Sequence, residues 1–333
     1  MENKSFNLTE VSFENSSNQL SIECKNIVKT YGDVKAVNNV SFNVQKGELF
    51  GLIGPDGAGK SSIFRILTTL LLADSGTATV DNFDVVKDYR EIRNRVGYMP
   101  GRFSLYQDLT VKENLNFFAT VFGTTLEENY DLIKDIYDQI KPFNNRRAGK
   151  LSGGMKQKLA LCCALIHKPK VLFLDEPTTG VDVVSRKEFW DMLDKLKMQG
   201  ITILVSTPYM DEATLCDRIA LIDNGSIMSI NTPENIIKSF PKTLFAAKAE
   251  NIYKLLQNLR NNSEIETCYV FGEYLHVTLK SNHNDILKVI NLVEQGNQKG
   301  IEVKIITPTI EDSFIRLMNE YHLNNDLKET HGK

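Results

Sequence analysis

Glu48-Leu-Phe-Gly-Leu-Ile-Gly-Pro-Asp-Gly-Ala-Gly-Lys-Ser-Ser62 is the stretch that decides the fold of this chain. Its apolar first part, residues 49–53, predicts a buried strand, and the apolar-periodic segment 63–72 behind it predicts a helix. Between them Gly54 to Ser61 complete the pattern G-x-x-x-x-G-K-S in the strand–loop–helix context that this motif requires. The stretch therefore predicts a site for a nucleoside triphosphate.

The chemistry of this loop follows from its residue types. Its glycines let the backbone turn tightly and point N–H groups at a phosphate chain, and the following helix adds partial positive charge. We expect Lys60 to bridge the β- and γ-phosphates and the Ser61 hydroxyl to bind Mg²⁺. The predicted nucleotide-binding residues here are Gly54, Pro55, Asp56, Gly57, Ala58, Gly59, Lys60, Ser61 and Ser62.

Composition limits the classes of function. The 333 residues are enough for about two domains, and the formal net charge of −3 argues against a nucleic-acid partner. No apolar run approaches the length of a membrane span, and the N-terminus lacks the apolar core of a signal peptide. We therefore expect a cytoplasmic protein. The five cysteines show no metal-ligand spacing and are expected to be small buried hydrophobes.

The N-terminal part of the chain predicts a small sheet in front of the phosphate loop. Residues 1–20 are rich in Asn, Ser and Glu and are predicted to be disordered. Strand-like segments at 21–28 and 36–44 flank a turn at Tyr31-Gly32, which predicts an antiparallel pair. Tyr31 is expected to stack on an adenine base, with a solvent-facing turn aromatic as the alternative.

A helical insertion is predicted after this sheet. Residues 109–140 have a helical pattern, and Thr110 with Glu113 forms a capping box at its start. Together with the helix after Leu151-Ser-Gly-Gly-Met155, this segment predicts a helical subdomain at about 101–165. The small residues before that second helix make another helix end suited to an anion.

Two adjacent carboxylates follow the next apolar run. Residues 171–174 predict a strand buried on both faces, and the run ends in Asp175-Glu176. A carboxylate at the end of such a strand, downstream of a phosphate loop, is placed to orient Mg²⁺, which predicts this role for Asp175. Glu176 is then the expected general base for water.

A second domain is predicted after a composition shift near residue 240. The nucleotide-binding domain is expected at 21–235, and the order strand–helix–strand–strand–helix–strand plus a helix at 310–318 predicts a ferredoxin-like α+β domain at 241–322. This region carries no catalytic constellation. The charged tail 323–333 is expected to be mobile.

Taken together, these motifs resemble the nucleotide-binding subunits of ABC transporters, over about residues 21–230. Tyr31 matches the aromatic that stacks on adenine in this family. The segment that is similar to the family's signature sequence is Leu151, Ser152, Gly153 and Gly154. Leu174-Asp-Glu-Pro-Thr-Thr-Gly-Val-Asp182 is similar to its Walker B motif and D-loop, the latter ending at Asp182. Within the family, the chain resembles ATPases of ABC-2-type exporters of drugs or of surface lipids and glycans.

The resemblance implies a fold, cofactors and partners. The fold is an α/β P-loop NTPase of ABC ATPase type, with a RecA-like core, an antiparallel β subdomain and an inserted helical subdomain, followed here by the ferredoxin-like domain. Two such subunits close head-to-tail on two ATP molecules with Mg²⁺, and the Ser152 loop acts on the ATP of the other subunit. Separate membrane-spanning permease subunits are the further partners, which places the protein peripherally on the inner face of the cell membrane.

Two positions depart from the family pattern. The glutamine of the family's Q-loop is replaced by Gly101, and its switch histidine is replaced by Pro208. Gln107 lies six residues downstream of Gly101 and is not expected to substitute. These departures lead to the hypothesis that the chain is the catalytically weaker half of an asymmetric pair, so that a heterodimer is favoured over a homodimer. The alternatives are a nucleotide-gated structural subunit and a soluble ABC protein acting on ribosomes or DNA.

Overall fold

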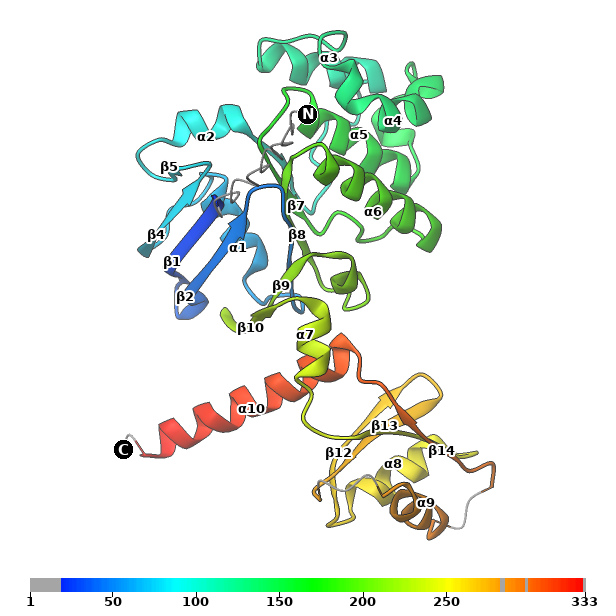
Figure 1. Ribbon diagram of the computed structural model, residues 1–333. Helices are drawn as coiled ribbons and strands as arrows, with labels where there is room; N and C mark the ends of the chain where they lie inside the picture. Colours follow the sequence, from blue (N-terminus) through cyan, green and yellow to red (C-terminus); the bar gives the residue numbers. More distant parts are fainter. Residues whose placement is uncertain (1–18, 282–284, 297–298, 332–333) are drawn as a thin grey trace, which may run out of the picture.

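The computed structural model describes residues 19–281, 285–296 and 299–331 (Figure 1). Of the segment 1–20 predicted to be disordered, residues 1–18 lie outside the described residues, and Leu20 already begins strand β1. Among the described residues, no helix combines the length and the apolar character that a membrane span needs.

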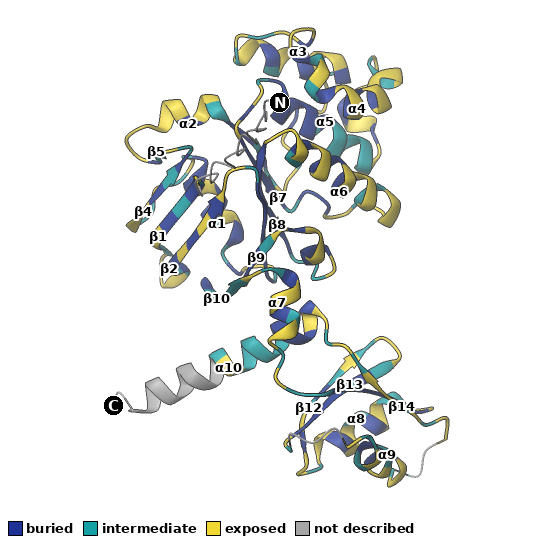
Figure 2. Cartoon of the chain, in the orientation of Figure 1, coloured by how far each residue is buried: buried dark blue, intermediate teal, exposed yellow. Residues whose placement is uncertain are grey.

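A six-stranded sheet forms the centre of the larger part of the molecule, with the order β10-β9-β3-β8-β7-β6. Its strands are β3 (Leu49–Ile53), β6 (Val96–Met99), β7 (Val171–Asp175), β8 (Thr202–Thr207), β9 (Arg218–Asp223) and β10 (Ser226–Asn231). All neighbours are parallel except β10, which is antiparallel to β9. Every residue of β3, β7 and β8 is buried, as continuous apolar runs predict for parallel strands covered on both faces (Figure 2).

The two faces of this sheet belong to two hydrophobic clusters. Along β3, Phe50 and Leu52 pack on the side of helix α1 (Lys60–Leu67), whereas Leu49 and Ile53 pack on the side of helix α6 (Val183–Met198). This alternation is the period-two arrangement of side chains along a strand. Both helices are thereby fixed against the strands whose ends carry the predicted site.

A four-stranded antiparallel sheet with the order β2-β1-β4-β5 lies beside the first (Figure 1). It consists of β1 (Leu20–Tyr31), β2 (Val34–Gln45), β4 (Ser75–Val80) and β5 (Phe83–Asp84). The predicted antiparallel pair is therefore confirmed, and both strands are longer than predicted. Helix α2 (Tyr89–Arg95) links this sheet to β6.

The inserted helices are α3 (Val111–Val121), α4 (Tyr130–Ile140) and α5 (Gly153–Leu165), with short 3₁₀ turns η1 (Lys141–Phe143) and η2 (Ala148–Lys150). The predicted capping box at the start of α3 is present: Thr110 Oγ1 accepts from Glu113 N at 3.2 Å, and Glu113 Oε2 accepts from Thr110 N at 2.8 Å. The single helical pattern of 109–140 is divided into two helices because Gly123 takes a left-handed conformation (φ +66°) just after α3.

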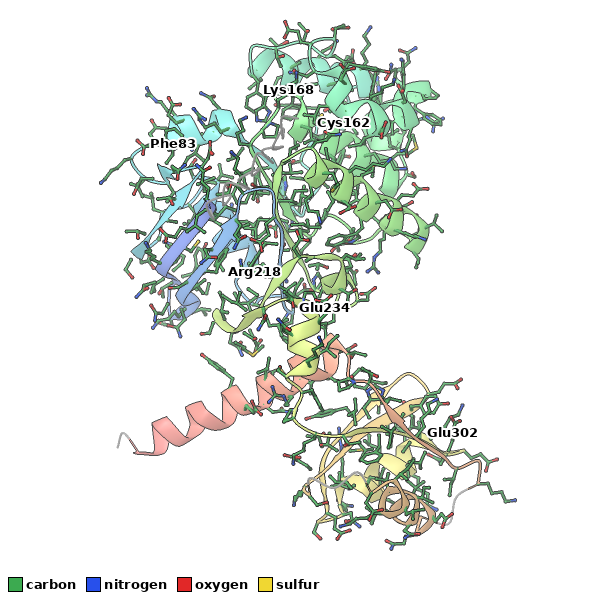
Figure 3. The ribbon with its side chains drawn as sticks, viewed as in Figure 1. Phe83, Cys162, Lys168, Arg218, Glu234 and Glu302 are labelled. Atoms are coloured by element: carbon green, nitrogen blue, oxygen red, sulfur yellow. The ribbon has the colours of Figure 1, made fainter. Side chains whose placement is uncertain are left out.

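A third sheet lies in the C-terminal part, after the 3₁₀ turn η3 (Glu212–Leu215) and helix α7 (Pro233–Lys238). Its elements are β11 (Leu244–Lys248), α8 (Ile252–Arg260), β12 (Ile265–Phe271), β13 (Tyr274–Leu279), α9 (Ile286–Glu294) and β14 (Glu302–Ile306). The strand order β12-β13-β11-β14, with antiparallel neighbours throughout, is that of the ferredoxin-like βαββαβ arrangement. Figure 3 labels Phe83 in the N-terminal sheet, Cys162 on α5 and Glu302 in this third sheet.

The last helix, α10 (Ile310–His331), is longer than the short helix predicted at 310–318, and the mobility expected of 323–333 stays a prediction. It continues as helix to His331, and its residues Ile310 and Phe314 pack with Ile236 of α7 in the hydrophobic cluster of the larger part. On its other side, Asp312 contacts His276 of β13. Helix α10 therefore joins the two parts, whereas the sequence assigned it to the C-terminal domain; the domain boundaries themselves stay a prediction. All five cysteines are buried, as predicted.

Candidate functional site

The phosphate loop connects the end of β3 to the start of α1. A Cβ atom on Gly54 would lie 2.1 Å from the carbonyl oxygen of Ile222, and one on Gly59 (φ +97°) would lie 2.1 Å from that of Ala36. Only glycine fits at either position. The loop is thus held closely between β9 and the N-terminal sheet.

Lys60 is folded back onto its own loop. Its Nζ atom donates to the carbonyl oxygens of Gly54 at 2.8 Å and Pro55 at 2.9 Å, and the residue is buried. Asp56, Gly57 and Ala58 complete the turn, and Ala58 O accepts from Gly225 N at 3.1 Å. Ser61 and Ser62 lie in the first turn of α1. The loop therefore presents a buried ammonium group at a helix N-terminus, the combination that binds phosphate.

The two predicted carboxylates lie at the carboxyl end of β7. Asp175 is its last residue and is buried, and its Oδ1 accepts from Ser206 Oγ at 2.6 Å. Glu176 takes a left-handed conformation (φ +51°), and its backbone N–H donates to Ser206. This conformation is uncommon for a residue other than glycine, and it lets the Glu176 side chain turn toward the loop.

An ion pair brings the carboxylates and the phosphate loop together. Glu176 Oε1 lies 3.1 Å from Lys60 Nζ, across the sheet edge where β3, β8 and β7 end. Ligand sites of open α/β sheets lie at this edge. Residues more than a hundred positions apart in sequence therefore lie together at this edge, and their assignment to one nucleotide site stays a prediction.

Tyr31 ends β1 beside this site. Its hydroxyl lies 3.4 Å from Ser62 Oγ, and the residue is 45% exposed, with Lys29 Nζ 5.8 Å from the ring centroid. The open ring face next to the phosphate-loop helix fits a stacked base, and that role stays a prediction.

The signature-like segment is placed against the start of α6. Leu151 is buried, and Ser152 caps α5 by accepting from Met155 N at 3.4 Å. A Cβ atom on Gly153 would lie 3.4 Å from Gly180 O, and one on Gly154 would lie 2.7 Å from Ser185 Oγ, which leaves room only for glycine at position 154.

Asp182 caps α6 in the same region by accepting from Ser185 N at 3.0 Å. This hydrogen bond holds the pKa of Asp182 below its usual value. Among the residues that the structure describes, no hydrogen bond or ion pair joins residues 151–154 to residues 54–62 of the same chain.

The two departures from the family pattern both lie at the site. Gly101 follows β6, and a Cβ atom there would lie 3.0 Å from Asp175 O and 3.7 Å from Glu176 Cβ. Any side chain at this position would begin against the backbone of Asp175 and the Cβ of Glu176. Pro208 directly follows β8, next to the strand end that carries Ser206. Gln107 is held elsewhere, with its carbonyl oxygen accepting from Gly149 N at 2.9 Å.

A buried polar cluster that the sequence did not reveal supports this edge of the sheet. Glu212 in η3 is almost fully buried and accepts from Thr178 Oγ1 at 2.8 Å, from Arg186 Nε at 3.0 Å and from Thr207 Oγ1. The Arg186 guanidinium also lies 4.2 Å from the ring centroid of Tyr209. The cluster ties the segments on both sides of Pro208 to the loop after β7. Its only sequence signal is Glu212 itself, an acidic residue five positions after the apolar strand β8.

A groove of about 470 Å³ lies between the end of β6 and the inserted helices. Its apolar lining includes Tyr98, Met99, Phe103, Leu105, Phe118 and Phe122. His167 stacks on Phe122 at a centroid distance of 3.7 Å, and burial lowers the pKa of this histidine. The segment that surrounds Gly101 thus forms one wall of an open apolar groove.

Comparisons with known proteins agree with this geometry. The family model described as "ABC transporter" matches residues 37–179. "Probable multidrug ABC transporter ATP-binding protein YbhF" of Escherichia coli is 38% identical over 292 residues, which cover 86% of this chain and 50% of that protein. The chain therefore spans half the length of this relative. "Nod factor export ATP-binding protein I" of Burkholderia lata is 41% identical over 221 residues, which cover 66% of this chain and 73% of that protein.

A solved structure of a dimeric ATP-binding cassette bound to ADP and Pi is also similar. It has a TM-score of 0.58 and 26% identity, and the match covers 63% of this chain and 98% of that one.

Proposed function

Because this chain belongs to the ATP-binding proteins of ABC transporters, we propose that it binds Mg-ATP at residues 54–62 and energises a membrane exporter. Its fold is the P-loop ABC ATPase fold predicted from the sequence. The observation that carries the proposal is the convergence of Lys60, Asp175 and Glu176, with Lys60 and Glu176 only 3.1 Å apart at the N-terminus of α1. A phosphate chain entering there meets a buried cation, backbone N–H groups and two carboxylates.

The donor set fits Mg²⁺. Ser61 supplies a hydroxyl and Asp175 a buried carboxylate, both oxygen ligands of the kind that Mg²⁺ prefers. Bound Mg²⁺ would neutralise charge on the β- and γ-phosphates. In this proposal Lys60 holds the same phosphates, Tyr31 stacks on adenine, and Glu176 takes a proton from water once ATP has displaced it from Lys60.

A second nucleotide-binding subunit is proposed to complete the site. Ser152, Gly153 and Asp182 lie together at the adjoining starts of α5 and α6. Beside them Val183 is 79% exposed and Val184 is 68% exposed, which is unusual for adjacent apolar side chains in a folded domain. This face suits a partner subunit whose ATP would be contacted by the Ser152 loop.

Permease subunits are proposed to dock in the groove beside β6. The groove is largely apolar, about 470 Å³ in volume, and its wall contains Pro100 and Phe103, which lie on either side of Gly101 in sequence. A helical segment of a permease held there would be linked through this wall to Asp175 and Glu176. The protein would accordingly act at the cytoplasmic face of a membrane, with drugs or surface lipids and glycans as the proposed cargo classes.

The finer proposal is that this subunit is the catalytically weaker half of an asymmetric pair. Gly101 offers no side chain beside Asp175 and Glu176, although a Cβ there would lie 3.0 Å from Asp175 O and 3.7 Å from Glu176 Cβ. Pro208 offers no donor at the end of β8. Loss of one preorganised donor lowers turnover by about 10²–10³-fold. The Ser152 loop, which would serve the partner's ATP, is complete. A nucleotide-gated structural subunit without turnover of its own is the second candidate, supported by the same two positions.

Steady-state ATP hydrolysis by the purified chain tests the finer proposal. We expect very slow turnover by the parent, little rescue by Pro208→His alone, and a gain of about 10²–10³-fold in the double variant Gly101→Gln/Pro208→His. Gly101→Ala/Pro208→His is the matched control for steric effects at position 101. Adding Glu176→Gln to the rescued double variant should remove the gained activity. Fast hydrolysis by the parent chain contradicts the asymmetric proposal.

In the assembled transporter, two variants distinguish the role of the Ser152 loop from that of Glu176. Ser152→Arg should abolish turnover, whereas Glu176→Gln should reduce it only modestly, because the partner's site would carry the activity. The opposite ranking of these two variants contradicts the asymmetric pair. ATP binding without hydrolysis in the double variant Gly101→Gln/Pro208→His supports the structural candidate instead.

A further inference from the structure

A second cavity lies in the C-terminal part, between the sheet and helix α10. Along β13, Leu275 and Val277 pack in the cluster that contains residues of α8 and α9, so the alternate residues His276 and Thr278 face the opposite side. The first half of helix α10 lies on that side, where Asp312 contacts His276 and Asn319 donates to the Tyr269 hydroxyl. The space left between them, named here the α10 cavity, has a volume of about 130 Å³.

The walls of the α10 cavity have two kinds of surface. One is apolar and consists of Phe240, Pro241, Leu244 and Ile315. The other is polar and includes Thr267 and Thr278, whose hydroxyl groups lie 2.7 Å apart in a hydrogen bond. A ligand that fills this cavity must therefore be amphipathic.

Most charged groups around the cavity are paired within the protein. Lys242 pairs with Glu266, and His276 Nδ1 lies 2.7 Å from Asp312 Oδ1. On α10, Arg316 Nη1 lies 2.6 Å from Glu320 Oε1.

Arg316 retains one unused edge. Its Nε atom is buried and has no hydrogen-bond partner, and no acceptor for Nη2 is found among the described residues. The guanidinium lies 5.9 Å from the ring centroid of Phe240, which is part of the apolar wall. The Nε–Nη2 edge of an arginine is one of the two positions at which a carboxylate accepts two parallel hydrogen bonds. A buried donor left without an acceptor is costly, which favours an acceptor supplied from outside the protein.

We propose that the α10 cavity binds a small monocarboxylic acid, whose carboxylate pairs with the Nε–Nη2 edge of Arg316 and whose apolar body packs on Phe240, Leu244 and Ile315. The volume limits the body to about three to five carbons, since a cavity of about 150 Å³ holds one benzene molecule. This site is independent of the nucleotide site and contains none of its residues.

The test uses the full-length chain without nucleotide and 4,4,4-trifluorobutanoate as the probe, followed by ¹⁹F NMR. We expect saturable binding in the millimolar range or tighter. The neutral isostere 4,4,4-trifluorobutan-1-ol should bind at least tenfold more weakly, because it offers no bidentate charged acceptor. Arg316→Gln should weaken probe binding by about tenfold to a hundredfold.

Two further variants keep the result decisive. Ile315→Phe fills the cavity from its apolar wall and should abolish binding while Arg316 remains. Arg90→Gln, on α2 and outside the cavity, is the matched control and should bind the probe like the parent. Thermal melts establish that each variant is folded. If Arg316→Gln is unfolded, the binding measured for Ile315→Phe decides the test. Absence of saturable binding to the parent, equal binding of the alcohol, or unchanged binding by folded Ile315→Phe overturns the proposal.

Discussion

Removing the Glu212 carboxylate should strongly destabilise the nucleotide-binding part of the chain. The side chain of Glu212 is 3% exposed and that of its partner Arg186 is 20% exposed, with Arg186 Nη2 2.9 Å from Glu212 Oε1. Thr178 and Thr207 donate to the same carboxylate. Glu212→Ala leaves two buried hydroxyl groups without their acceptor, and it leaves the half-buried Arg186 guanidinium with only the exposed Asp211 carboxylate, 3.3 Å from its Nη2. Breaking a buried pair from one side costs about 3–5 kcal/mol.

Thermal unfolding followed by circular dichroism measures this effect. For a folded part of this size, about 3–5 kcal/mol corresponds to a fall in Tm of roughly 6–20 °C. Glu212→Gln keeps one oxygen acceptor but loses the charge, so its effect should be intermediate, about 1.5–3 kcal/mol. Glu127→Ala is the matched control at an exposed position and should stay within about 0.5 kcal/mol of the parent. A Tm of Glu212→Ala equal to that of Glu127→Ala would refute the reasoning.

Three other predictions concern the loop, the groove and the C-terminal part. Gly59→Ala should lower Tm and ATP affinity more than Gly200→Ala. Both positions have positive φ, but only at Gly59 would the added Cβ lie 2.1 Å from a backbone atom. Equal losses of Tm and ATP affinity in the two variants would contradict this. Burial lowers the pKa of His167 in the folded chain. As the pH falls, the imidazole is therefore protonated in the unfolded chain before it is protonated in the folded one. The free energy of unfolding should accordingly fall as the pH drops below about 6.5, the usual pKa of histidine. His167→Gln should reduce that pH slope in chemical denaturation, and an unchanged slope counts against the assignment. A chain ending at Phe240 should be less stable than the full-length chain, because it loses the packing of Phe314 in the cluster of the larger part. Calorimetry should show that its ATP affinity is unchanged. Loss of ATP binding in a folded truncation would place the C-terminal part at the nucleotide site.

Local sequence patterns predicted those parts of the site that are formed by residues close together in the sequence. The phosphate loop, the buried strand ending in Asp175 and the capping box at Thr110 are each contained in a few consecutive residues, and each lies where it was expected. Their convergence was predictable because parallel strands end at one edge of a sheet. Glu176 was predicted as a base, but its left-handed backbone and its pairing with Lys60 were not.

Features that depend on distant contacts were not predictable. Glu212 meets Arg186 and Thr178, which are 26 and 34 positions away, only after η3, α6 and the loop after β7 have packed. Helix α10 was assigned to the C-terminal domain because it follows β14 in sequence, but Ile310 and Phe314 find their apolar partners on the other part. Periodicity shows that a helix has an apolar face and not which surface covers it.

Equilibrium titration of the full-length chain with Mg-ATP tests the central claim most directly. Lys60 Nζ lies at the proposed phosphate position, held by Gly54 O, Pro55 O and Glu176. Lys60→Ala should therefore weaken ATP binding by about tenfold to a hundredfold, the value of one charge-assisted contact. Lys46→Ala, at an exposed position, should bind ATP like the parent. Equal ATP affinity of Lys60→Ala and the parent chain would contradict the assignment of this loop as the nucleotide site.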